Sequence, residues 1–83
     1  MESSTQRNQN TGLSNSTYNI LMALGKEAEF LYSAIPTYTN DAQKENRSDL
    51  VDVWNTIKQD RQRHLQTLKD VLEREAKENR LNQ

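Results

Sequence analysis

Residues 50–72 read LVDVWNTIKQDRQRHLQTLKDVL, and the pattern of this stretch predicts most of the fold. Its apolar residues recur three and four positions apart, which is the spacing of one face of an α-helix. Between Ile57 and Leu65 the same face carries Arg61 and His64 instead of apolar residues. The stretch therefore predicts a long amphipathic helix with a polar interruption at its centre, where a functional site is expected.

A second apolar pattern precedes this stretch, again in steps of three and four: Leu21, Leu24, Ala28, Leu31, Ile35, Tyr38 and Ala42. This is the spacing of a helix that packs along another helix. Pro36 lies inside the pattern and has no backbone N–H to donate, which predicts a kink or a break near residue 36. Because the apolar register continues past Pro36, we expect one kinked, continuous helix.

The polar segment 44–49, KENRSD, predicts the turn between the helices, with Asn46 or Ser48 as the next N-cap. The helices then span about 15–44 and 48–79, each roughly 45 Å long at 1.5 Å per residue. Equal lengths and a short connection favour an all-α fold, an antiparallel two-helix hairpin over residues 14–80. Residues 1–13 are polar and predicted to be disordered, and residues 81–83 are predicted to fray.

The composition leaves little material for a core, because only 33% of the 83 residues are apolar and 28% are charged. The chain has no cysteine, so disulfides cannot compensate. The apolar face of the second helix is also wider than one helix can cover. We therefore expect two hairpins to form a four-helix bundle, as a homodimer or a larger oligomer. The expected interface consists of Leu50, Val53, Trp54, Ile57, Leu65, Leu68 and Leu72.

The charges exclude several classes of partner. Eleven basic and twelve acidic residues give a net charge of −1, and the two signs alternate along the second helix. A nucleic-acid-binding surface would be more one-sided, so nucleic acid is an unlikely partner. No apolar run approaches the length that spans a bilayer, and the first residues do not form a secretory signal. The expected location is the cytoplasm, without membrane association.

The polar interruption has an expected neighbour on the first helix. A turn near Asn46 brings His64 level with about Ala28 and Arg61 level with about Leu31, so that Glu27 can reach both. The sequence predicts a cluster of Glu27, Arg61 and His64. Its favoured interpretation is an ion pair that sets the register of the helices. The alternative is a metal site with Glu27 and His64 as ligands.

The run VWNTIKQDRQRHLQTL, residues 53–68, resembles the second helix of ferritin-like and rubrerythrin-like bundles. That helix carries an aromatic residue, an Ile three positions later, and then Glu-x-x-His as inward-facing metal ligands. Trp54, Ile57 and His64 match these positions, and Glu27 lies where the family places a bridging carboxylate. Arg61 replaces the ligand Glu. The resemblance therefore implies a bundle that is retained without its usual di-iron centre.

No arrangement typical of an enzyme is present: there is no Ser/His/Asp set, no Gly-rich phosphate loop and no cysteine nucleophile. The first hypothesis is a non-catalytic structural or protein-interaction module that self-associates, without a cofactor, and whose partners are itself and possibly another protein. The alternative is a ferritin-like protein that binds iron, or another divalent metal, between hairpins through Glu27 and His64.

Overall fold

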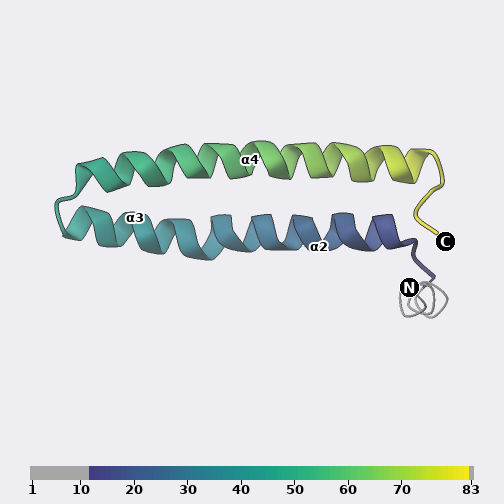
Figure 1. Cartoon of the computed structure of the whole chain (residues 1–83), viewed down its shortest axis with the longest axis horizontal. Coiled ribbons are helices and arrows are strands. Elements are labelled where there is room, and N and C mark those ends of the chain that lie inside the picture. The colour runs from purple at the N-terminus through teal and green to yellow at the C-terminus, as the bar shows by residue number, and fades with distance from the viewer. Residues whose placement is uncertain (1–11, 83) are drawn as a thin grey trace.

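The structure, a computed structural model, describes residues 12–82; most of the tail that was predicted to be disordered lies outside this range. The elements are α2 (Asn15–Glu29), the π-helical turn η1 (Phe30–Ala34), α3 (Ile35–Lys44) and α4 (Ser48–Lys77). The all-α prediction is confirmed. Figure 1 shows α2 and α3 lying along α4 in the opposite direction, with the turn at one end and both termini at the other.

The first helix continues past Pro36 because one of its turns is widened. In an α-helix the residue at position 36 would donate its N–H to the carbonyl of Tyr32, which proline cannot do. In η1 the N–H of Ile35 instead donates to the carbonyl of Phe30, five residues back. Pro36 then falls in the first turn of α3, where proline is tolerated. The proline therefore changes the hydrogen bonding of one turn and does not break the helix.

The first helix and α4 are each followed, two residues after their last residue, by an asparagine with a left-handed backbone. Asn46 has a φ of 57°, and the following residue, Arg47, donates its N–H to the carbonyl of Ala42 at 2.8 Å. Asn79 has a φ of 59° and ends α4 by the same pattern. Asparagine tolerates this conformation better than most residues. The prediction of Asn46 or Ser48 as the N-cap of the second helix is wrong, because Arg47 occupies that position.

The hairpin is long and thin, and its core is small. Its radius of gyration is 17.3 Å, against about 12 Å for a compact domain of this length. Among residues 12–82 the buried ones are Ile35, Ala42 and the polar Thr17. Six large apolar side chains remain exposed: Tyr18, Leu21, Met22, Tyr32, Tyr38 and Val53. Much of the apolar side-chain surface of the hairpin thus remains exposed to solvent.

One of these exposed residues, Leu21, corrects the predicted packing face of the first helix. Leu21 was expected to face the second helix, yet it is 42% exposed, whereas Tyr38, equally exposed, does contact Trp54 of α4 with ring centroids 5.0 Å apart. An α-helix repeats every 3.6 residues, so a strict pattern of threes and fours drifts around its surface. Ile20 and Leu24 are half-buried in the region where Leu21 was expected to pack.

Candidate functional site

The structure brings Glu27, Arg61 and His64 together at the middle of the hairpin. Arg61 Nη1 donates a hydrogen bond to Glu27 Oε1 at 3.3 Å, and His64 Nδ1 lies 3.4 Å from Glu27 Oε2. The Glu27 side chain is 17% exposed, whereas that of His64 is 61% exposed. A single carboxylate on α2 therefore engages two residues of α4, one helical turn apart.

Arg61 is held from a second side by an aromatic ring. Its guanidinium carbon lies 4.4 Å from the centroid of the Phe30 ring, a cation–π contact. The Phe30 ring meets that of Tyr38 edge-on at 6.3 Å, and Tyr38 lies 5.0 Å from Trp54. The polar cluster therefore continues into an aromatic cluster that extends toward the turn. Together these contacts fix how far α4 is shifted along the first helix.

The side chains present do not fit the di-iron centre of the ferritin-like bundles that the sequence resembles. A di-iron site needs several carboxylate and histidine ligands directed at one point. Here a guanidinium occupies one oxygen of Glu27 and adds positive charge where a cation needs negative charge. In the part of the chain that the structure describes, no three His, Asp, Glu or Cys side chains converge as a metal site. The contacts of this cluster can hold the two helices in a defined register.

The seven residues predicted as an oligomer interface fall into two groups. Val53 is 45% exposed, whereas the other six are half-buried within one hairpin. Leu50 and Trp54 line a shallow hollow against Tyr38 and Ala42 of α3. Leu65 lines a different hollow, on the other side of the hairpin. Their role between copies stays a prediction.

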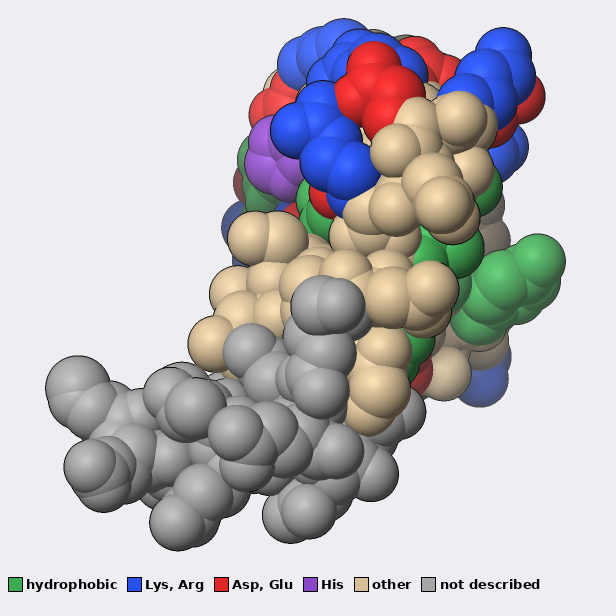
Figure 2. All heavy atoms as spheres, turned by 90° about the vertical axis from the view of Figure 1, so that its right-hand side faces the viewer, with side chains coloured by type: hydrophobic (Ala, Val, Ile, Leu, Met, Phe, Trp, Pro, Cys, Tyr) green, Lys and Arg blue, Asp and Glu red, His purple; other side chains and the backbone are tan. Residues whose placement is uncertain are grey.

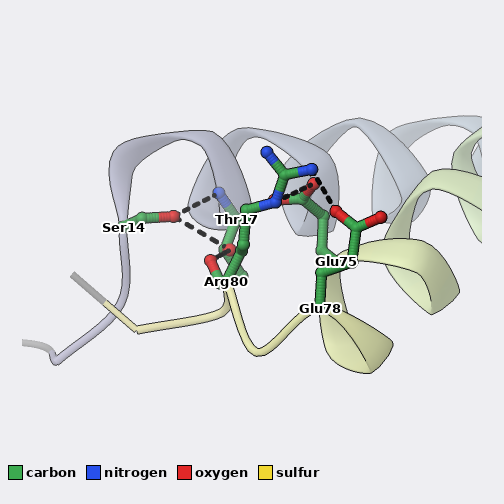
Figure 3. A network of polar contacts seen from close by, with 5 residues as sticks. All are labelled: Ser14, Thr17, Glu75, Glu78 and Arg80. Carbon is green, nitrogen blue, oxygen red and sulfur yellow. Dashed lines mark hydrogen bonds and ion pairs between the residues drawn. The ribbon is translucent and has the colours of Figure 1, made fainter.

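Sequence reasoning missed a polar clasp that joins the two ends of the hairpin (Figure 3). The Ser14 hydroxyl accepts the Thr17 N–H at 3.0 Å and donates to the Thr17 hydroxyl at 2.9 Å. The Thr17 hydroxyl in turn donates to the backbone carbonyl of Arg80 at 3.4 Å. The contact crosses 63 positions of sequence, so local sequence patterns do not indicate it.

The chain after α4 is part of the same clasp. Ser14 donates its N–H to the carbonyl of Leu81 at 3.1 Å, and Leu13 pairs with Asn82 as an antiparallel bridge. Residues 81 and 82 are thus paired where the sequence predicts a frayed end. The Arg80 guanidinium forms ion pairs with Glu78 and Glu75, which raise its pKa, the Glu78 hydrogen bond contributing most. The chain turns back at Asn79, whose backbone is left-handed.

Comparison with known protein families, with curated proteins and with solved structures found no match for this chain. Among residues 12–82, none of the helices combines the length and the apolar character needed to cross a membrane. The residues themselves therefore carry the functional argument.

Proposed function

We propose that this chain is a non-catalytic helical hairpin that associates with copies of itself into a four-helix bundle, and acts as a structural or protein-interaction module. One observation carries the proposal. The large apolar side chains left exposed outnumber the apolar side chains that the hairpin buries among residues 12–82. Burying a large apolar side chain completely is worth about 1.5–3 kcal/mol. Association supplies the burial that one hairpin lacks.

The size and charge of the chain support the same proposal. Domains this small are marginally stable alone, and those without disulfides commonly rely on a metal or on oligomerisation. With a net charge of −1, two copies repel each other only weakly. Self-association is therefore the stabilising route that this composition favours.

The cluster of Glu27, Arg61 and His64 has a supporting role in this proposal. The ion pair is partly exposed, and pairs of this kind contribute little to the free energy of unfolding. Its value lies in specificity: a shift of α4 by one turn would remove both contacts to Glu27. The cluster thus keeps the outer faces of the two helices in a defined alignment for association.

The test is to follow oligomeric state and helicity together over a concentration range. Sedimentation and circular dichroism from about 1 to 100 μM are expected to show a dimer or larger oligomer whose thermal midpoint rises with concentration. A folded monomer whose midpoint is independent of concentration would contradict the proposal.

The alternative is divalent metal binding, and the contact between His64 and Glu27 is the observation that favours it. An anaerobic iron(II) titration by calorimetry separates the two functions. Saturable micromolar binding that is lost in His64→Ala would replace the proposal above. An Arg61→Glu variant is the matched comparison, because it restores the Glu-x-x-His pattern and removes the competing cation.

A further inference from the structure

One face of the first helix, here called the Gly25 face, consists of Tyr18, Leu21, Met22, Gly25 and Tyr32, all of which are exposed and precede Pro36. Tyr18, Leu21, Met22 and Tyr32 are 38%, 42%, 44% and 85% exposed. They recur with Gly25 at helical spacing and lie beside the residues that face α4. Figure 2 looks along the hairpin from the end with the termini, and apolar side chains stand out there on the flank away from the histidine. Apolar groups of this size cluster on surfaces that bind a partner.

A hollow lies beside this face, between the two helices. It measures about 290 Å³ and is lined by Ala28, Leu31 and Tyr32 of the first helix, and by Lys58, Gln62 and Leu65 of α4. Its inner wall is apolar, while Lys58 and Gln62 supply polar groups at its edge. This combination of an apolar centre and a polar rim is typical of a protein–protein contact.

The Gly25 face is symmetric about its own centre. Tyr18 lies seven positions before Gly25 and Tyr32 lies seven positions after it, which is close to two helical turns on either side. A two-fold interface requires a surface that matches itself in this way. If two α2 helices cross antiparallel at Gly25, Tyr32 meets the partner's Tyr18, and Leu21 lies level with the partner's Glu29, next to the Ala28 side of the hollow. The symmetry argues for a second copy of this chain as the occupant.

Gly25 is suited to the crossing point. It is exposed, and a Cβ atom added there would meet nothing within 4 Å in the single hairpin. A glycine inside a helix costs about 1 kcal/mol relative to alanine, and the single hairpin offers no packing reason for it. At a helix crossing, the missing side chain allows the two backbones to approach closely.

We propose that two copies pair through the Gly25 face, with their α2 helices antiparallel and Leu21 of each copy in the hollow of the other. This inference rests on the proposed self-association and names its surface. The four exposed side chains offer about 500 Å² per copy, so that the pair buries about 1,000 Å², the lower limit of a specific interface. Glu29 lies on the same face one turn after Gly25, and Lys58 lies at the edge of the hollow.

Gly25→Gln is the most informative variant, because it is expected to preserve the folded hairpin and to weaken the association of two copies. In the single hairpin the longer side chain enters open space and improves helix propensity, so helicity is kept. At the crossing it separates the helices, and the dissociation constant is expected to rise by about 100-fold or more. Asn19→Gln, also exposed on α2 but away from this face, is the control that should leave association unchanged.

A second pair of variants asks which helix carries the interface. Leu21→Gln and Val53→Gln remove side chains of nearly equal exposure, 42% and 45%, from α2 and from α4. The inference expects the α2 variant to weaken the dimer about 10- to 100-fold and the α4 variant to leave it unchanged. The opposite result would place the interface on α4 and overturn the inference, while self-association would stand.

Cross-linking tests the two-fold crossing directly, since the chain has no cysteine of its own. Two Gly25→Cys chains that cross at this position have Cα atoms near the distance that a disulfide spans. Mild oxidation is expected to give a covalent dimer, and Val53→Cys is expected to remain uncrosslinked. A dimeric protein in which Gly25→Cys does not crosslink overturns the inference alone. A wild-type chain that stays monomeric at every concentration overturns both the inference and the proposed function.

Discussion

The two ends of the hairpin are closed by different physical means. At the turn end, Ile35 and Ala42 are buried, and the Tyr38 and Trp54 rings lie 5.0 Å apart. At the end with the termini, the buried residue is Thr17, which is held by hydroxyl hydrogen bonds. One end therefore has an apolar core of its own, whereas the other is joined by polar contacts.

This difference indicates which half of the hairpin would gain more stability from the proposed association with a second copy. A hydrogen bond adds only about 1 kcal/mol net, because the groups also bond to water when the chain is unfolded. The polar clasp therefore orders the terminal end without burying its apolar neighbours, Leu21 and Met22, which stay exposed. Stability is unevenly distributed along such a chain, and the terminal half is the part that association would strengthen.

The largest expected effect comes from Ile35→Ala at the turn end. Ile35 is only 4% exposed, and truncation of a buried Ile removes transfer energy and leaves a cavity. We expect the free energy of unfolding to fall by about 2–4 kcal/mol, measured by urea denaturation at one protein concentration. Val53→Ala, at an exposed position, is the control and should cost less than about 1 kcal/mol. Equal losses in both variants would erase the contrast between the ends.

A smaller effect is expected from Ser14→Ala at the clasp. The substitution removes the helix cap and the hydroxyl that donates to Thr17. Loss of such a cap costs about 1 kcal/mol. Hydrogen exchange should speed up near residues 14–18 while the amides of α3 keep their protection. Ser16→Ala, two residues further on and exposed, should change neither quantity.

The central ion pair is expected to contribute still less. A double-mutant cycle with Glu27→Gln and Arg61→Met should give a coupling energy of about 0.3–1 kcal/mol, because the Arg61 side chain is 38% exposed. The measurement is urea unfolding of the four proteins. A coupling of several kcal/mol would mean that the pair is a main source of stability and not a register-setting contact.

The smallest effect is a dependence on pH near the turn. Arg47 donates two hydrogen bonds to Asp49, at 3.0 and 2.8 Å, and these lower the pKa of Asp49 to about 2. Because the folded pKa lies below that of the unfolded chain, near 3.9, the pair stabilises the fold above about pH 4. This contribution is lost as the pH falls toward 2. The thermal midpoint of Asp49→Asn should decline less over that interval than that of the wild type.

Periodicity in the sequence was enough to predict the helical fold, because the apolar spacing of Leu50, Trp54 and Ile57 has only one regular interpretation. It also indicated that Glu27 would lie near His64, since the turn fixes the register and 1.5 Å per residue fixes the level. These inferences depend on local spacing alone.

The features that could not be predicted are those that depend on rotation and on distant contacts. How far each helix turns about its own axis decides whether Leu21 is buried or exposed, and a small drift per turn changes the answer. The widened turn before Pro36 depends on which carbonyls find donors. The contact of Thr17 with Arg80 needs the whole hairpin to be formed first.

The pairing of Leu13 with Asn82 means that the described chain comes back to its starting point and forms nearly a closed ring. A covalent link between these two positions would leave the folded hairpin unchanged, because Leu13 and Asn82 already lie side by side. Its effect would fall on the unfolded chain, which would lose the freedom to separate its ends, a loss that grows slowly with loop length. Circularisation would therefore stabilise one hairpin without altering either of its outer faces.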